Sequence, residues 1–181
     1  MTTPVPTPQE KALKRVLLVS AIDGWSVVVI AVLGTLLTLL LGDLAGVGVG
    51  LLVLAAGIME LRARRRLKRR DVAGMKQLVR AQLLLLAVVL VYCASRLGSY
   101  DQESMLANLT PDMKAMLKES GVEVSEILPL VQMFFFATYG IVALLTLLFQ
   151  GGLILYYRGK TPLVTEALAA PPPVPPNSPL A

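Results

Sequence analysis

The sequence predicts an all-α, polytopic membrane protein: a bundle of four transmembrane helices with a short amphipathic helical outer loop. Three observations favour this fold class. The 181-residue chain is 55% hydrophobic and 16% charged, whereas a typical soluble domain is roughly 25% charged, and its mean hydropathy is +0.69. Four long segments are almost free of charge. Lys and Arg are concentrated in the segments that would share one side of a membrane.

The first two apolar segments, 16–41 and 44–61, are expected to form a helical hairpin. A helix needs about 20 apolar residues to cross the hydrocarbon core of a bilayer. Gly42 can adopt the left-handed conformation that ends the first helix, and Asp43 can cap the second. Because only these two residues separate the segments, the connection should be a tight antiparallel turn.

The third segment, 78–97, carries Arg80 and Arg96 near its ends, and the fourth, 127–157, carries no charge. We expect Asp71 to cap a helix that continues into the third span. The fourth would be about 46 Å long at ~1.5 Å per residue, so it must tilt, project from the bilayer or break near its Gly-Gly pair. Leucine runs in the spans lack the alternation that barrel strands require.

The other segments complete the predicted organisation. Fourteen of the 17 Lys and Arg residues lie before the first span, between the second and third, or after the fourth. The positive-inside rule therefore places both termini in the cytoplasm. The predicted units are a disordered N-terminus (1–15), three helices (16–97) with a basic cytoplasmic loop (62–77), an outer loop (98–126), the fourth helix (127–157) and a Pro-rich tail (158–181).

The outer loop is too long to be a bare turn. Its Met and Leu residues recur at helical spacing, Pro111 is suited to a first helical turn, and Gly121 to a helix end. We expect two short amphipathic helices on the outer membrane surface or over the bundle. A structural cap and a ligand-binding lid are the two interpretations.

A stripe of glycines predicts close helix packing. Small residues at four-residue spacing let helix backbones approach closely in lipid. The stripe can pack against similar residues of the same chain or against a second copy. Its members are Gly42, Gly46, Gly50 and Gly57 around the second span, and Gly34 in the first.

Asp23 is the leading candidate for an intramembrane polar site. An ionised side chain in a span is costly, by about 2.5–3.5 kcal/mol or more, so Asp23 should face the bundle interior, be protonated or have a partner. The candidate partners at similar depth are Glu60, Arg80, Gln82 and Gln150. The group is either a structural polar layer or a proton or cation site. In the structural layer, Asp23 would pair with Arg80, accept a hydrogen bond from Gln82 or Gln150, or reach the lipid headgroups.

A dense basic run follows the second span. Such a run sets membrane topology and contacts anionic lipid headgroups, each charge adding about 1 kcal/mol near the surface. No nucleic-acid-binding fold accompanies it, so nucleic acid is not an expected partner. Its members are Arg62, Arg64, Arg65, Arg66, Lys68, Arg69 and Arg70.

The composition argues against an enzyme. The chain has no histidine and one cysteine, Cys93, so we expect no metal site, no cofactor and no catalytic residue. The first functional hypothesis is a structural or accessory membrane subunit that acts through helix packing, as a homo-oligomer or with a partner membrane protein. The alternative is a small oligomeric transporter or channel-like protein that uses Asp23. The Ala-, Leu- and Arg-rich composition is typical of bacteria, which favours the cytoplasmic (inner) membrane.

Overall fold

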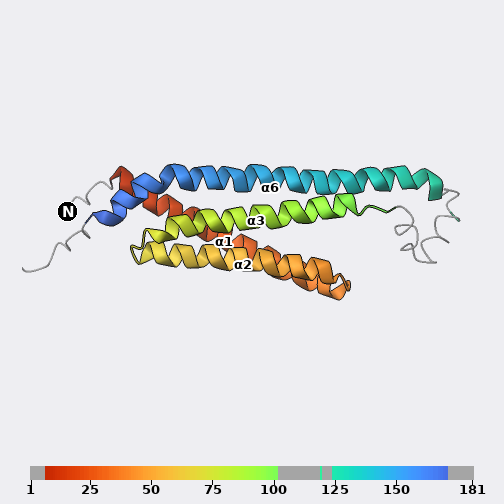
Figure 1. Cartoon of the computed structure of the whole chain (residues 1–181), viewed down its shortest axis with the longest axis horizontal. Helices are drawn as coiled ribbons and strands as arrows, with labels where there is room; N and C mark the ends of the chain where they lie inside the picture. The colour runs from red at the N-terminus through yellow and green to blue at the C-terminus, as the bar shows by residue number, and fades with distance from the viewer. Residues whose placement is uncertain (1–6, 102–118, 120–123, 171–181) are drawn as a thin grey trace, which may run out of the picture.

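The computed structural model describes residues 7–101, 119 and 124–170. Within these ranges the chain forms four long helices: α1 (Pro8–Leu40), α2 (Leu44–Lys68), α3 (Ala73–Gly98) and α6 (Val124–Ala169) (Figure 1). Each is long and apolar enough to cross a membrane. The predicted all-helical class with four apolar helices is therefore confirmed. The expected amphipathic helices of the outer loop fall almost entirely outside the described residues.

The hairpin between α1 and α2 forms as its turn residues predict. Gly42 has a positive φ of 71°, a backbone conformation that glycine adopts without steric penalty. The Asp43 side chain accepts a hydrogen bond of 3.0 Å from the backbone N–H of Gly46 and so caps the start of α2. These two local interactions reverse the chain direction within a few residues.

The connection between α2 and α3 is shorter than the basic loop 62–77 expected from the sequence. Helix α2 continues through most of the basic run to Lys68, and α3 begins at Ala73. The N-cap of α3 is Val72, which makes no side-chain capping bond, so the expected cap at Asp71 lies one residue further out. Asp71 accepts a 2.9 Å hydrogen bond from the backbone N–H of Ala73, the first residue of α3. Arg70 has a positive φ of 64°, which completes the turn.

Helix α6 is longer than the fourth predicted span. It has 46 residues, about 69 Å at ~1.5 Å per residue, and it includes both the Gly-Gly pair and the first part of the predicted tail. Its final turns are held by packing, because Val164, Ala167 and Leu168 are buried. That burial explains why the helix does not end where the uninterrupted apolar run ends.

The four helices pack most closely at one end of the molecule. We call this the terminal end, because it holds the start of α1 and the end of α6, and we call the other end, with Gly42, the turn end (Figure 1). Along the chain each helix packs on the next, and α6 also packs on α1. The main core lies at the terminal end and is formed by Val16, Ala63, Leu67, Met75, Leu78, Tyr157, Val164 and Leu168.

Packing is looser towards the turn end. There the α1–α2 hairpin diverges from α3 and α6, and α6 continues beyond the hairpin turn (Figure 1). A small core of Val27, Ala56 and Leu85 lies between these helices. The most apolar window of α6 has no buried residue, so this part of the helix presents apolar side chains to its surroundings.

Candidate functional site

Four polar side chains, one from each helix, meet in the packed half of the molecule. We call Asp23, Glu60, Gln82 and Tyr157 the polar layer. Gln82 Nε2 donates a 2.6 Å hydrogen bond to Asp23 Oδ2, and the Tyr157 hydroxyl donates a 3.1 Å hydrogen bond to Glu60 Oε1. The two carboxyl groups also interact with each other, and Glu60 with Gln82. The layer therefore joins all four helices.

The layer is largely enclosed. Glu60, Gln82 and Tyr157 are 1%, 0% and 0% exposed, and Asp23 is partly buried. The sequence analysis named three of these four residues, and the structure brings those three together. Tyr157 was missed, because a tyrosine near the end of an apolar span is also typical of an aromatic belt at the membrane surface.

The other two candidate residues lie outside the layer. Arg80 is exposed, and the partner that the structure gives Asp23 is Gln82 instead. Gln150 is partly buried on α6, and its Oε1 atom has no hydrogen-bond partner among the described residues. The Arg80–Asp23 ion pair considered from the sequence therefore does not form here.

The composition of the layer limits its chemistry. Its two carboxyl groups lie together, with an amide and a phenol as their neighbours and no Lys or Arg among the described contacts. Nor do the described residues contain any group of three or more Asp, Glu, Cys or His that could hold a metal ion.

Glycines of the predicted stripe form close contacts between α1 and α2. A Cβ added to Gly57 would lie 2.9 Å from a Val28 side-chain atom on α1, and one added to Gly46 would lie 2.7 Å from Thr38. Gly50 faces Thr35 just as closely. Around Gly34 and Gly42, by contrast, an added Cβ would meet nothing within 4 Å. Three of the five glycines thus pack within the chain.

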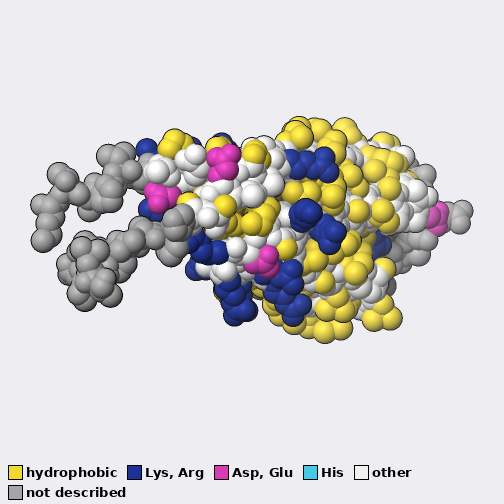
Figure 2. Space-filling model, turned by 60° about the vertical axis from the view of Figure 1, so that its left-hand side comes forward, with side chains coloured by type: hydrophobic (Ala, Val, Ile, Leu, Met, Phe, Trp, Pro, Cys, Tyr) yellow, Lys and Arg dark blue, Asp and Glu magenta, His cyan; other side chains and the backbone are white. Residues whose placement is uncertain are grey.

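The basic run on α2 has both structural and exposed members. Arg64 Nε donates a 3.0 Å hydrogen bond to the Leu17 carbonyl of α1, and Arg70 donates to the Ala167 and Ala170 carbonyls at the end of α6. Figure 2 shows Lys and Arg side chains gathered between the apolar body and the chain ends. The exposed members of the run are Arg62, Arg65, Arg66, Lys68, Arg69 and Arg70.

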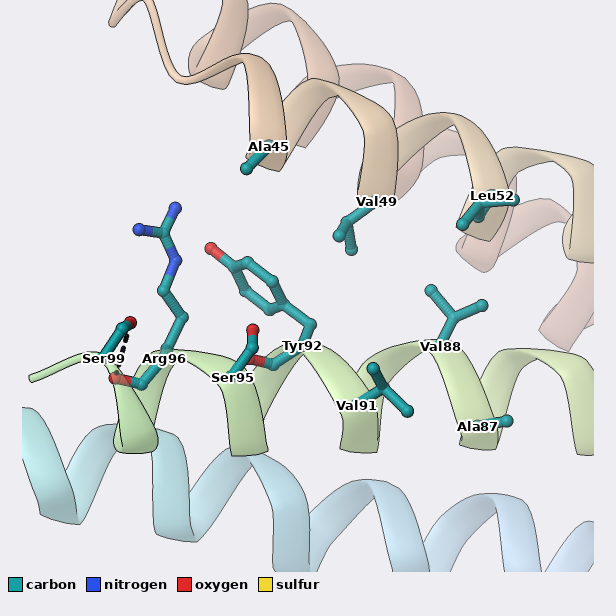
Figure 3. A pocket seen from close by; sticks show the side chains of 10 residues that line it. All are labelled: Ala45, Val49, Leu52, Ala87, Val88, Val91, Tyr92, Ser95, Arg96 and Ser99. Carbon is teal, nitrogen blue, oxygen red and sulfur yellow. Dashed lines mark hydrogen bonds between the residues drawn. The ribbon is translucent and has the colours of Figure 1, made fainter.

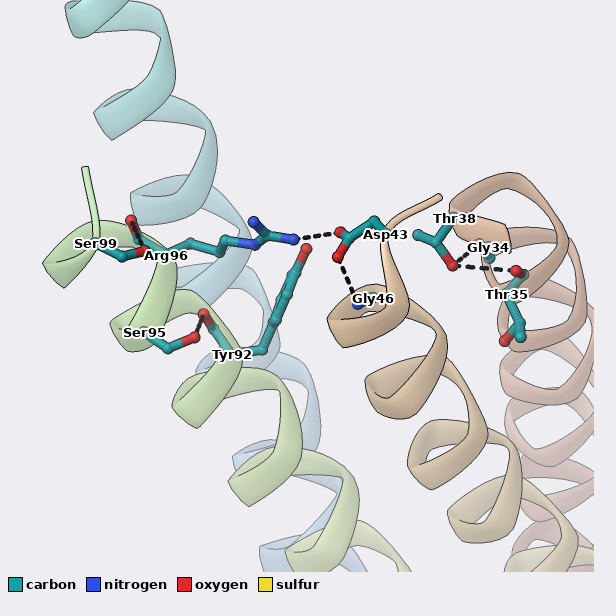
Figure 4. A network of polar contacts seen from close by, with 9 residues as sticks. All are labelled: Gly34, Thr35, Thr38, Asp43, Gly46, Tyr92, Ser95, Arg96 and Ser99. Carbon is teal, nitrogen blue, oxygen red and sulfur yellow. Dashed lines mark hydrogen bonds and ion pairs between the residues drawn. The ribbon is translucent and has the colours of Figure 1, made fainter. Parts of the chain in front are cut away.

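An apolar cleft opens between α2 and α3 at the turn end (Figure 3). It has a volume of about 440 Å³. The Arg96 guanidinium lies 5.2 Å from the centre of the Tyr92 ring and forms an ion pair with Asp43 across the end of the cleft (Figure 4). The lining residues are Ala45, Val49 and Leu52 of α2, and Ala87, Val88, Val91, Tyr92, Ser95, Arg96 and Ser99 of α3.

Asp43 thus has two roles, of which the sequence indicated one. Its Oδ1 atom caps α2 and its Oδ2 atom binds Arg96, so it fixes the α1–α2 turn to the end of α3. The ion pair was missed because Asp43 and Arg96 are 53 residues apart. The signal that could have identified it is their shared placement at the predicted outer ends of two spans.

Aromatic contacts hold α3 to α6 where α2 diverges from them. The ring centroids of Tyr92 and Tyr139 are 6.1 Å apart, and those of Tyr100 and Phe135 are 5.1 Å apart. Such tilted and edge-on pairs contribute about 0.5–1.5 kcal/mol beyond simple burial. The cleft therefore has one wall that is fixed to α6 and another that belongs to the α1–α2 hairpin.

No protein-family model, curated protein or solved structure matches the chain.

Proposed function

We propose that the protein is a non-enzymatic integral membrane subunit with a structural or accessory role that it performs through helix packing. The observation that carries this proposal is the polar layer. Its hydrogen bonds join α1 to α3 and α2 to α6, and the interaction between Asp23 and Glu60 links the two pairs, so the layer favours one relative arrangement of the helices over slipped alternatives. Buried polar groups that act in this way fix helix register more than they add stability.

The contacts of Asp23 favour this structural role over transport. An ion or proton pathway needs carboxyl groups that water can reach, whereas Glu60 and its hydrogen-bond donor Tyr157 are almost fully buried. Each carboxyl group has a donor from another helix. The transporter remains the second hypothesis, because Asp23 itself keeps some exposure.

The proposed setting is the cytoplasmic (inner) membrane of a bacterium, with both termini in the cytoplasm. The basic run of α2 lies at the terminal end of the bundle, and the positive-inside rule assigns an end rich in Lys and Arg to the cytoplasm. The exposed basic side chains would lie against anionic lipid headgroups. The cleft and the unburied apolar window of α6 provide surfaces for a partner membrane protein or a second copy.

A double-mutant cycle in the purified protein tests the structural role. Asp23→Leu or Gln82→Leu alone leaves one buried partner without its hydrogen bond, whereas the double variant removes both partners. We expect the double variant to be more stable than additivity predicts, by about 0.6–1.7 kcal/mol, as for hydrogen bonds between membrane helices. Gln150→Leu is the matched control, because the hydrogen bond that the structure gives Asp23 comes from Gln82 and not from Gln150, and it should show no coupling to Asp23→Leu.

Proton-flux measurements in proteoliposomes test the alternative. Wild type and Asp23→Asn are compared across a pH gradient, and we expect no flux from either protein. Clear wild-type flux that disappears in Asp23→Asn, together with additive stabilities in the cycle, would replace the structural role with transport.

A further inference from the structure

A small basic hollow lies between the start of α1 and the end of α6, and none of its lining residues belongs to the polar layer or to the α2 basic run. It has a volume of about 250 Å³. Three of the six residues that line it are cationic, and none is acidic. Its lining consists of Pro8, Lys11, Ala12, Arg15, Lys160 and Leu163.

Both helices contribute charge to this hollow. On α1 the lining residues fall at positions i, i+3, i+4 and i+7, which share one helix face, and Lys160 and Leu163 of α6 are likewise three residues apart. A 3.4 Å hydrogen bond between Gln9 and Glu166 joins the two helices nearby. Packing of two antiparallel helices therefore assembles a cationic group that is not contiguous in the sequence.

Within the described part of the chain, the three cations of the hollow form no ion pair with a protein group. The one ion pair within residues 7–101 and 124–170 is Arg96–Asp43, at the opposite end of the molecule. Glu10 and Glu166, which lie near the hollow residues in the sequence, accept hydrogen bonds from the Thr7 backbone N–H and from Gln9 and form no ion pair with the three cations. Like charges held close together repel each other, so a bound anion would offset an unfavourable interaction.

The position of the hollow points to an anion from the membrane. Arg15 immediately precedes Val16, where the apolar part of α1 begins, and it interacts electrostatically with Tyr156 on α6. Tyrosines are enriched at the boundary between lipid tails and headgroups. Pro8, Ala12 and Leu163 line the hollow beside the cations, so it offers apolar surface for the acyl chains and basic groups for the phosphate of a phospholipid.

We propose that Lys11, Arg15 and Lys160 form a binding site for the phosphate of an anionic phospholipid. Basic pockets between transmembrane helices on the cytoplasmic side are suited to such headgroups. This site differs from the α2 basic run, because its three cations come from two helices, whereas the run lies along α2 and the turn that follows it. The proposal requires insertion in a membrane, but it is independent of whether the polar layer is structural or conducts protons.

Lipid binding by the full-length protein tests the proposal. Delipidated protein in neutral detergent is titrated with phosphatidylglycerol, and binding is followed by native mass spectrometry and by the shift in Tm. The test variant is Lys11→Gln/Arg15→Gln/Lys160→Gln. The matched control, Arg65→Gln/Arg66→Gln/Lys68→Gln, removes the same charge from the exposed run. We expect roughly 100-fold weaker binding for the test variant and nearly unchanged tight binding for the control.

Two further arms keep the result decisive. Because Lys11 is exposed, Lys11→Gln alone should leave the fold intact and still weaken binding about fivefold, which guards against a triple variant that misfolds. Phosphatidylcholine and inorganic phosphate are the ligand controls, and neither should raise Tm. Equal weakening in both triple variants would overturn the proposal, as would an undiminished affinity in Lys11→Gln. Stabilisation by inorganic phosphate alone would assign the site to a soluble anion instead.

Discussion

Gly57→Ala tests whether close contact between α1 and α2 holds the hairpin together. A Cβ at position 57 would lie 2.9 Å from Val28 Cγ2, 3.0 Å from Val27 Cγ1 and 3.3 Å from the Val28 backbone nitrogen. Real Cβ atoms almost never approach other atoms this closely. Valine side chains on a helix are restricted at χ1, and the backbone nitrogen is fixed in α1, so the helices themselves must separate.

The matched control is Gly48→Ala on the same helix, where an added Cβ would meet nothing within 4 Å. Both substitutions gain the same helix propensity, about 0.5–1 kcal/mol for alanine over glycine. This gain cancels when the two variants are compared. The difference between them is then the overpacking cost at position 57, typically about 1–3 kcal/mol, which corresponds to a factor of roughly 5–150 in the unfolding equilibrium.

Reversible unfolding in mixed detergent micelles measures this difference. We expect Gly48→Ala to be at least as stable as wild type and Gly57→Ala to be less stable than Gly48→Ala by at least 1 kcal/mol. If the two variants have equal free energies of unfolding, the α1–α2 contact is looser than its geometry indicates, and the packing argument fails.

Three other measurements probe separate contacts. Arg70→Gln removes the guanidinium that binds two carbonyls at the end of α6, so backbone hydrogen exchange over residues 164–169 should accelerate about tenfold. Arg69→Gln is the control and should leave the exchange rate unchanged. Equal exchange rates in the two variants would refute this capping role of Arg70. Asp43→Ala should lose about 1 kcal/mol more stability than Asp43→Asn, because asparagine still caps a helix. If chemical unfolding shows equal losses in the two variants, the helix cap contributes nothing and the whole loss comes from the ion pair with Arg96. Reporter fusions at residues 66–70 and at the C-terminus should report cytoplasm and a fusion near Ser120 the outside, and a cytoplasmic signal near Ser120 would contradict four spans.

Local features of the fold could be predicted because their causes lie within a few residues. Hydrophobicity over about 20 residues identifies a possible span, and the Gly42–Asp43 turn depends on one left-handed residue and one side-chain cap. Local hydropathy alone placed the end of the fourth helix, α6, too early. Its last turns are stabilised by burial against other helices, and a window of local hydropathy does not register such contacts.

Tertiary packing decides which residue is the hydrogen-bond partner of Asp23. Arg80 and Gln82 are two residues apart, which on a helix with 3.6 residues per turn places them about 200° apart. Only one of them can face the core. The buried residues of α3, which include Leu78, Ala81 and Leu85, share the face of Gln82, so Arg80 points outwards. Their helical spacing is the signal in the sequence that would have favoured Gln82.

The sequence by itself determined that this chain forms four long apolar helices and where the first hairpin turns. Those properties follow from hydropathy and from short-range capping. Only the tertiary structure decided that Tyr157 completes the polar layer, that Asp43 pairs with Arg96, and that Lys11, Arg15 and Lys160 share one hollow. Each of these groupings depends on the rotation and axial offset of whole helices, which are set by the summed packing of many side chains along each interface.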